Sequence, residues 1–325
     1  GTENILTKRA VSDCIQEGLG NRSGHPLLRQ EGSVSEGTGR QTETMEKSSI
    51  HSELVTGAFV CSAQAFLRIG LATTIVRIIG QLSIPAGEQT VLAPSVFAQN
   101  GTMPLAFTVY GIFAYSLIAS LFLLIRNRLS GNRVLQGLKY GLSCCAVWIV
   151  YLLEPLPHVA GFDRITYPIA DSIALIVMGL LLGWLFGNPA RRADKEKSPF
   201  PILPVLAVTG GFFVGRMIQY LVFGIYSSFD EKPLETVLWC LLTGTAISCV
   251  TAWLNLYIHS KNRIKRALIL GGMLFGVDLF LFNFFMPLVF DANIPDLILR
   301  TFIDILAVTV GCLAFPNQRN VDPAD

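Results

Sequence analysis

The chain has 325 residues, of which 51% are hydrophobic and only 15% are charged. Soluble domains carry about 25% charged residues, so this composition excludes an ordinary soluble globule and favours an integral membrane protein. The net charge of +2 provides no basic excess for binding nucleic acid. Seven cysteines are too few for a disulfide scaffold. We therefore expect the lipid bilayer to be a partner and nucleic acid not to be one.

The first 52 residues differ from the rest of the chain. They are rich in Gly, Ser, Thr, Glu and Arg, and such a segment buries too little apolar surface to offset its conformational entropy. We predict a disordered cytoplasmic tail over 1–52. Two interpretations stay open for residues 1–44: they are sequence upstream of a natural start at Met45, or they belong to the native tail.

Eight later segments are long and apolar enough to cross a bilayer, which takes about 20 residues per helix. Backbone groups in lipid need internal hydrogen bonds, and the alternation of barrel strands is missing, so these segments should be helices. The sequence predicts an all-α integral membrane protein with eight transmembrane helices. The segments are 55–81, 104–126, 134–156, 165–187, 201–226, 234–258, 265–289 and 295–315.

Basic residues concentrate in every second connection between these segments. The opposite connections carry only Arg164 and Lys232. Because basic loops stay in the cytoplasm, we expect both termini, including a C-terminal tail over 316–325, to be cytoplasmic. We also expect the membrane to be the inner (plasma) membrane of a bacterium. The residues on the basic side are Arg126, Arg128, Arg133, Lys139, Arg191, Arg192, Lys195, Lys197, Lys261, Arg263, Lys265 and Arg266.

The two halves of the chain match at rare polar positions. Arg77 begins Arg-Ile-Ile-Gly-Gln-Leu in the first segment, and Arg216 begins Arg-Met-Ile-Gln-Tyr-Leu in the fifth. Shared Leu, Ile and Gly arise in any two membrane segments, but matching intramembrane charges favour a duplication. We predict two parallel four-helix repeats, 53–190 and 201–315, joined by the basic linker 191–200 and related by a pseudo-two-fold axis along the membrane normal. Other matched pairs are Pro104 and Pro233, Arg133 and Arg263, Gly141 and Gly271, and Asp171 and Asp304.

Charged residues inside membrane segments are costly, and they rarely face lipid. With both termini inside, Arg77 and Asp171 lie at comparable depths in the first repeat, as do Arg216 and Asp304 in the second. Each arginine can pair with the acid of its own repeat, because a bidentate contact offsets part of the desolvation cost. Two interpretations stay open: the pairs line a polar path, or they hold helices together.

Asp278 has no acidic counterpart in the first half, where Trp148 occupies the matched position. An asymmetric acid in a duplicated scaffold is a candidate proton or cation site. It is equally a candidate partner for Arg68 or Arg300. Asn283 adds polarity to the same segment.

The third segment ends in Glu154-Pro155-Leu156-Pro157-His158, where two prolines break the helix. We interpret Glu154 and His158 as solvated groups of a helix-ending turn, because a metal site needs more ligands than one histidine and nearby acids. We predict no metal and no cofactor. The segments contain no pair of histidines for haem and no mid-membrane lysine for a retinal Schiff base.

Glycines spaced by four residues are typical of close helix packing, within the fold or between protomers of a homo- or hetero-oligomer. Our leading hypothesis is a small secondary transporter that moves a solute or ion between the two halves. A non-catalytic scaffold or regulatory subunit and a lipid-modifying enzyme at Glu154, His158 and Asp163 are the alternatives. The glycines are Gly137, Gly141, Gly179, Gly183, Gly187, Gly211, Gly215, Gly272 and Gly276.

Overall fold

The computed structural model describes residues 60–84, 91–159, 161–189, 201–258 and 260–316. The chain divides into two units, residues 1–67 and residues 68–325. In the first unit, the described residues form the start of one helix. The remaining described residues belong to the second unit, which begins within the same helix. The predicted tail over 1–52, the linker 191–200 and all but residue 316 of the C-terminal tail lie outside the described residues.

The described part of the chain is helical and contains no β-strand. Seven of its helices are long and apolar enough to cross a membrane, and they identify a multi-pass integral membrane protein. These are Val60–Leu82, α4 (Met103–Leu121) with its short 3₁₀ extension η1 (Phe122–Leu124), α5 (Arg133–Leu152), α6 (Asp163–Phe186), α7 (Ile202–Leu221), α8 (Pro233–Asn255) and the composite helix Arg263–Val289.

The eighth predicted segment forms helix α12 (Ile294–Cys312), which has 19 residues. It is not among the seven helices, and it carries three charged residues, Asp296, Arg300 and Asp304. The number of membrane spans therefore stays a prediction.

Helices α5 and α7 end four and five residues earlier than the sequence predicts. Helix α5 ends at Leu152 rather than at residue 156, because Pro155 and Pro157 lack the N–H that would continue the helix. Helix α7 ends at Leu221 rather than at residue 226. The chain then turns at Gly224, whose φ of +58° is the left-handed conformation that favours glycine.

The composite helix Arg263–Val289 is not a uniform α-helix. It consists of α9 (Arg263–Ala267), the π-helical segment η2 (Leu268–Phe275), α10 (Gly276–Asn283) and α11 (Met286–Val289). Segments of π-helix are rare and often lie at functional sites. Here the π-helical segment ends three residues before Asp278. Its Gly271 packs so tightly against Thr309 of α12 that a Cβ would overlap the threonine backbone.

Helices α5 and α6 pack through their glycines. A Cβ at Gly141 would lie 2.8 Å from the carbonyl oxygen of Leu175 and 3.0 Å from Cα of Gly179. Gly137 of α5 and Gly183 of α6 meet in the same way. These glycines are therefore used for contacts within the chain, because only a residue without a side chain allows the backbones to approach this closely. Oligomer formation stays a prediction.

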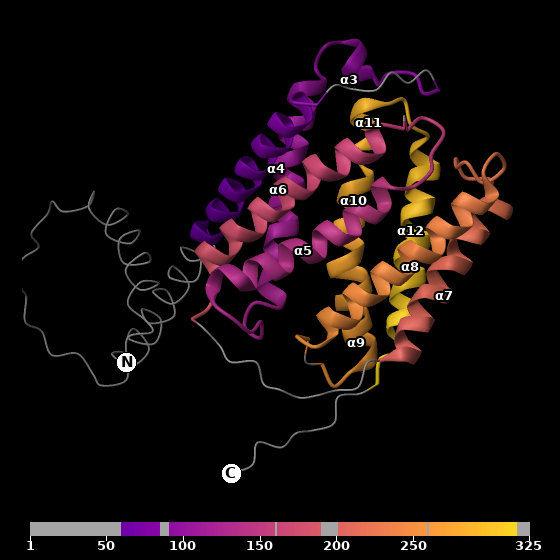
Figure 1. Ribbon diagram of the computed structural model, residues 1–325. Coiled ribbons are helices and arrows are strands. Elements are labelled where there is room, and N and C mark those ends of the chain that lie inside the picture. The colour runs from indigo at the N-terminus through magenta and orange to yellow at the C-terminus, as the bar shows by residue number, and fades with distance from the viewer. Residues whose placement is uncertain (1–59, 85–90, 160, 190–200, 259, 317–325) are drawn as a thin grey trace, which may run out of the picture. The chain divides into compact units, whose positions relative to one another are not determined.

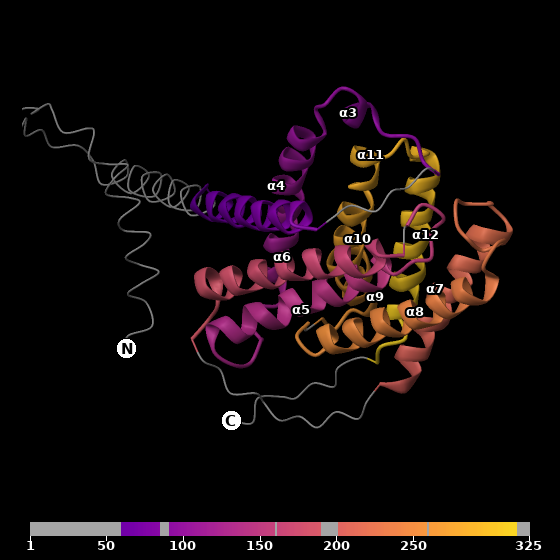
Figure 2. The same ribbon diagram turned by 45° about the horizontal axis from the view of Figure 1, so that its top comes forward.

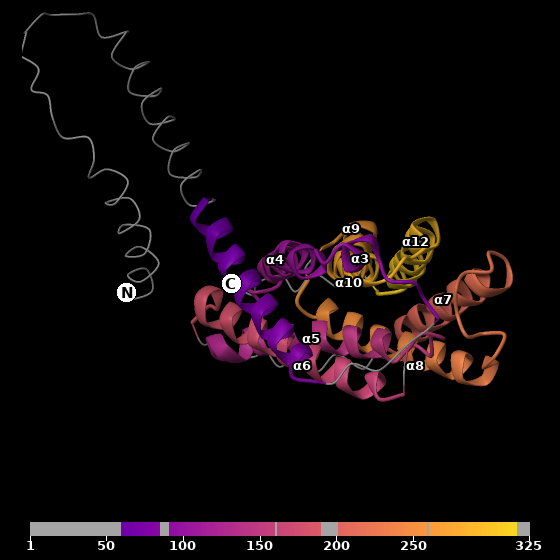
Figure 3. The same ribbon diagram turned by 90° about the horizontal axis from the view of Figure 1, so that it is seen from above.

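Helix α5 lies between α6 and α8 (Figure 1). Helix α7 contacts both α8 and α12, and α12 also packs on the π-helical segment. The first half of the chain meets the second where α5 contacts α8, where α4 contacts α10, and where α5 contacts α10. Figure 3 shows these elements from above, with α5 between α6 and α8.

The short helices α3 (Val96–Gln99) and α11 contact each other at one end of the long helices, which we call the α3 end (Figure 2). An isolated antiparallel bridge there joins Pro94, which precedes α3, to Phe290, which follows α11. The Ser95 N–H donates to the carbonyl of Val289 at 3.0 Å, and the Asp291 N–H donates to that of Ala93 at 2.9 Å. The bridge ties a connection of the first half to one of the second half.

Candidate functional site

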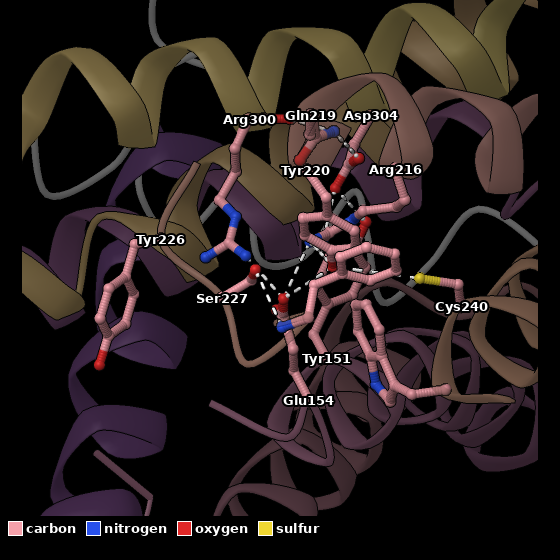
Figure 4. Close-up of polar contacts among 12 residues, drawn as sticks. Tyr151, Glu154, Arg216, Gln219, Tyr220, Tyr226, Ser227, Cys240, Arg300 and Asp304 are labelled. Atoms are coloured by element: carbon pink, nitrogen blue, oxygen red, sulfur yellow. Dashed lines mark hydrogen bonds and ion pairs between the residues drawn. The ribbon is translucent and has the colours of Figure 1, made fainter. Parts of the chain in front are cut away.

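Four buried charged side chains meet between α5, α7 and α12 (Figure 4). Arg216 Nη2 lies 2.7 Å from Asp304 Oδ2, and Arg216 Nη1 lies 3.0 Å from Glu154 Oε1. Arg300 Nη2 lies 2.6 Å from the same Glu154 oxygen. Two cations and two anions balance, which offsets the cost of removing these groups from water. We call these four residues the charged cluster.

Neutral polar groups complete the charged cluster. Gln219 Nε2 donates to Asp304 Oδ1 at 2.7 Å, and the Tyr151 hydroxyl donates to Asp304 Oδ2 at 3.0 Å. The Tyr220 hydroxyl donates to Glu154 Oε1 at 3.4 Å. Sequence reasoning missed these three residues. A signal for Gln219 was present, because Gln81 follows Arg77 much as Gln219 follows Arg216.

The burial of Glu154 corrects our interpretation of the segment after α5. We expected a solvated side chain, but Glu154 is buried and accepts from two arginines. The backbone turns back directly after the helix, with the Glu154 N–H donating to the carbonyl of Tyr151. This turn directs the carboxylate between α7 and α12. The arginines of these two helices lie far from Glu154 in the sequence, so the sequence does not identify them as its neighbours.

The predicted pairing of Arg77 with Asp171 is present in the structure. Arg77 Nε and Nη2 donate to the two carboxylate oxygens of Asp171 at 2.8 and 2.9 Å, and Gln81 Nε2 lies 3.4 Å from Oδ1. Aromatic rings cover the guanidinium, whose carbon lies 4.1–6.0 Å from the ring centroids. The rings belong to Phe107, Tyr115, Trp148 and Phe285.

Asp278 is buried without a cation beside it among the described residues. Its Oδ1 accepts a hydrogen bond from the indole Nε1 of Trp148 at 2.9 Å. Neither predicted cationic partner is used, because Arg300 pairs with Glu154 and Arg68 is exposed. Asp278 also lines a cavity of about 20 Å³, which is room for about one water molecule.

The two remaining candidates, Asn283 and His158, contact residues outside the charged cluster. Asn283 Nδ2 donates to Thr301 Oγ1 at 2.7 Å and joins α10 to α12. His158 stacks on Tyr226, and its Nδ1 lies 3.2 Å from the tyrosine hydroxyl. Burial lowers the pKa of His158, while nearby Glu154 opposes and Arg300 reinforces this shift. Burial also raises the pKa of Tyr226.

A larger cavity of about 310 Å³ opens at the α3 end. Its size falls in the range of small-molecule sites. Leu92 and Asp291 line it from the bridged segments, Tyr226 from the α7–α8 connection, and Asp296 and Arg300 from α12. Arg300 therefore belongs both to this cavity and to the charged cluster.

Within the described part of the chain, no three His, Cys, Asp or Glu side chains are grouped as a metal site. Comparisons of the chain with protein-family models, curated proteins and solved structures find no match.

Proposed function

We propose that this protein is a small secondary transporter that moves a solute or ion between two related four-helix halves. The observation that carries the proposal is the continuity from the α3-end cavity into the charged cluster. Arg300 lines the cavity and contacts Glu154, which contacts Arg216, which contacts Asp304. A buried, charge-balanced series that begins at a cavity is a polar route into an otherwise apolar bundle.

Matched polar contacts support the two repeats. In each half, an arginine and a glutamine of the first helix bind one aspartate of the fourth: Arg77 and Gln81 with Asp171, and Arg216 and Gln219 with Asp304. The third helix of each half also begins in the same way. Asn132 and Asn262 accept backbone hydrogen bonds as N-caps, and an arginine follows each.

The contacts between the halves also support a pseudo-two-fold axis. The third helix of the first half, α5, contacts the second helix of the other half, α8. The third helix of the second half is the composite helix Arg263–Val289. Its α10 contacts α4, which is the second helix of the first half. Reciprocal contacts of this kind are expected at an interface between two-fold related units.

The faces of α12 support an eighth span. Arg300 and Asp304 face the protein, with 5% and 0% of their surfaces exposed. The opposite face carries exposed apolar residues every fourth position, which suits contact with lipid. With an even number of spans and the basic connections inside, both termini would lie in the cytoplasm, and the plasma membrane of a bacterium is the membrane we propose. The apolar residues are Ile298, Phe302, Leu306 and Val310.

Asp278 is the group that we assign to proton coupling. A carboxyl with no cation beside it among the described residues can gain or lose a proton without breaking an ion pair, and the adjacent 20 Å³ cavity has room for a water to carry that proton. Arg77 and Asp171 have a different role in this proposal. Their bidentate pair under four rings holds the first helix against α6.

The two alternatives fit these contacts less well. A scaffold predicts a dry interior in which every charge is paired, which leaves the 310 Å³ cavity and the unpaired Asp278 without a role. A lipid-modifying enzyme requires Glu154, His158 and Asp163 to work together. Glu154 instead binds two arginines, and His158 contacts Tyr226.

The test is uptake by proteoliposomes that enclose a pH-sensitive dye. The wild type is screened with amino acids, organic acids, amines, sugars and inorganic ions, both under a proton gradient and by exchange against preloaded solute. We expect one class to enter with protons. Asp278→Asn should abolish proton movement while solute exchange persists, and Asp230→Asn, a change at an exposed acid in the α7–α8 connection, should leave both intact. Failure of every solute class, or unaltered proton coupling in Asp278→Asn, contradicts the proposal.

A further inference from the structure

The cavity at the α3 end presents one buried cation with unused hydrogen-bonding capacity. Arg300 is 5% exposed, and its Nη2 donates to Glu154. Its Nε has no hydrogen-bond partner among the described residues. A guanidinium carries five N–H donors in a planar fork that matches a carboxylate. A buried donor left without a partner is costly, so Arg300 is poised to receive an acceptor from the cavity that it lines.

The same cavity presents two carboxylates. Asp291 and Asp296 both line it, Asp291 is exposed, and Asp296 is half-buried. Neither is within ion-pair distance of Arg300 in the described structure, although Asp296 lies one helical turn before it. Asn293, between them, uses its side-chain oxygen to cap the Asp296 N–H. The cavity therefore holds a positive and a negative side that do not neutralise each other directly.

This arrangement discriminates between ligands by the charges that they carry. A ligand with only a carboxylate is attracted by Arg300 but repelled by the two aspartates. A ligand with only an amine is attracted by the aspartates but repelled by Arg300. A molecule that carries both groups satisfies both sides at once, and charge complementarity of this kind discriminates against ligands that carry only one of the two charges. The volume of about 310 Å³ accommodates a ligand of amino-acid size.

We propose that the α3-end cavity binds small zwitterions, with the ligand carboxylate on Arg300 and its ammonium group beside Asp291 and Asp296. The inference rests on the proposed function in one respect, since it makes the zwitterion the solute that is carried. The ligand carboxylate would bind the Arg300 guanidinium, which also binds Glu154. Ligand binding would therefore be coupled to the charged cluster through Arg300.

The test is equilibrium binding to the full chain purified in detergent, measured by titration calorimetry without any transport. The probes are the natural amino acids and glycine betaine. Each probe that binds is compared with its deaminated acid and its decarboxylated amine. We expect both analogues to bind at least tenfold more weakly than the zwitterion.

Two variants separate recognition from folding. The double variant Asp291→Asn, Asp296→Asn changes groups that are not fully buried and make no ion pair in the described structure. It should weaken zwitterion binding at least tenfold while raising the affinity for the deaminated acid. Arg300→Lys keeps the charge but removes the fork, and it should weaken both the zwitterion and the acid. Glu235→Gln, an exposed change at the start of α8, is the matched control.

The result decides between clear outcomes. Equal affinity for a zwitterion and one of its analogues, unaltered binding in the double aspartate variant, or no binding of any probe overturns the assignment. Zwitterion binding without uptake in proteoliposomes upholds the site and removes the transport proposal. Uptake of another solute class, with no zwitterion bound, removes this inference and leaves the transport proposal standing.

Discussion

Trp148 of α5 donates a hydrogen bond from its indole Nε1 to Asp278 Oδ1 of α10 at 2.9 Å. Both residues lie fifteen positions after the arginine that begins their segment, Arg133 in α5 and Arg263 in α9. Under the proposed duplication they are equivalent positions. Two equivalent positions contact each other directly only beside the axis that relates the halves, so this hydrogen bond marks where that axis would pass.

The Trp148–Asp278 contact should show energetic coupling. Trp148→Phe leaves a buried carboxyl without its donor, and Asp278→Leu leaves a buried indole N–H without its acceptor, at about 1–3 kcal/mol each. The double variant should lose less than the two single losses added together. Reversible unfolding in mixed micelles measures the three free energies. Additive losses would show that the contact contributes nothing.

The Arg77–Asp171 pair should matter for stability and not for uptake. Arg77→Leu or Asp171→Leu alone strands one buried charge, which should lower the free energy of unfolding by about 3–5 kcal/mol. The double variant removes both charges and should be more stable than either single one. It should also retain solute exchange in proteoliposomes, whereas Arg216→Leu with Asp304→Leu should not. Loss of exchange in both double variants would place the first pair in the transport route.

The glycine contact between α5 and α6 should tolerate no side chain. A Cβ at Gly137 would overlap the backbone of Gly179 and Gly183, so Gly137→Ala should destabilise the protein by about 1–3 kcal/mol. Gly210 of α7 has no such neighbour within 4 Å. Gly210→Ala should leave stability unchanged or raise it by up to about 1 kcal/mol, because alanine favours a helix more than glycine does. Thermal unfolding of the two variants side by side checks the difference.

Stability should fall on acidification partly because of His158. Burial lowers the pKa of this imidazole in the folded protein below its ordinary value of 6.5. Between the two pKa values the unfolded chain binds more protons, so the free energy of unfolding decreases as pH falls from 6.5 through the folded-state pKa. His158→Gln should flatten this part of the profile when unfolding is measured from pH 8 to pH 5. Parallel profiles for wild type and variant would show that His158 does not contribute.

The charged residues illustrate how far sequence reasoning reaches. Arg77 and Asp171 were paired by their depth and by their matching positions in the two halves, and they are in contact. A separate inference, from the prolines that end α5, predicts a solvated Glu154, but this residue is buried between two arginines. The depth of a residue in the membrane follows from counting residues along its helix. The direction of a side chain just after a helix end depends instead on the turn that the backbone makes there.

The sequence by itself determined the helices and the membrane, because a shortage of charge over long apolar segments leaves the backbone only one way to satisfy its hydrogen bonds in lipid. Only the tertiary structure decided that Glu154 and Arg300 join Arg216 and Asp304 in one site. Glu154 and Arg300 are 146 residues apart and meet at 2.6 Å, and the cavity beside them is lined by segments from both halves. Long-range packing brings these side chains together, and no local pattern of residues records it.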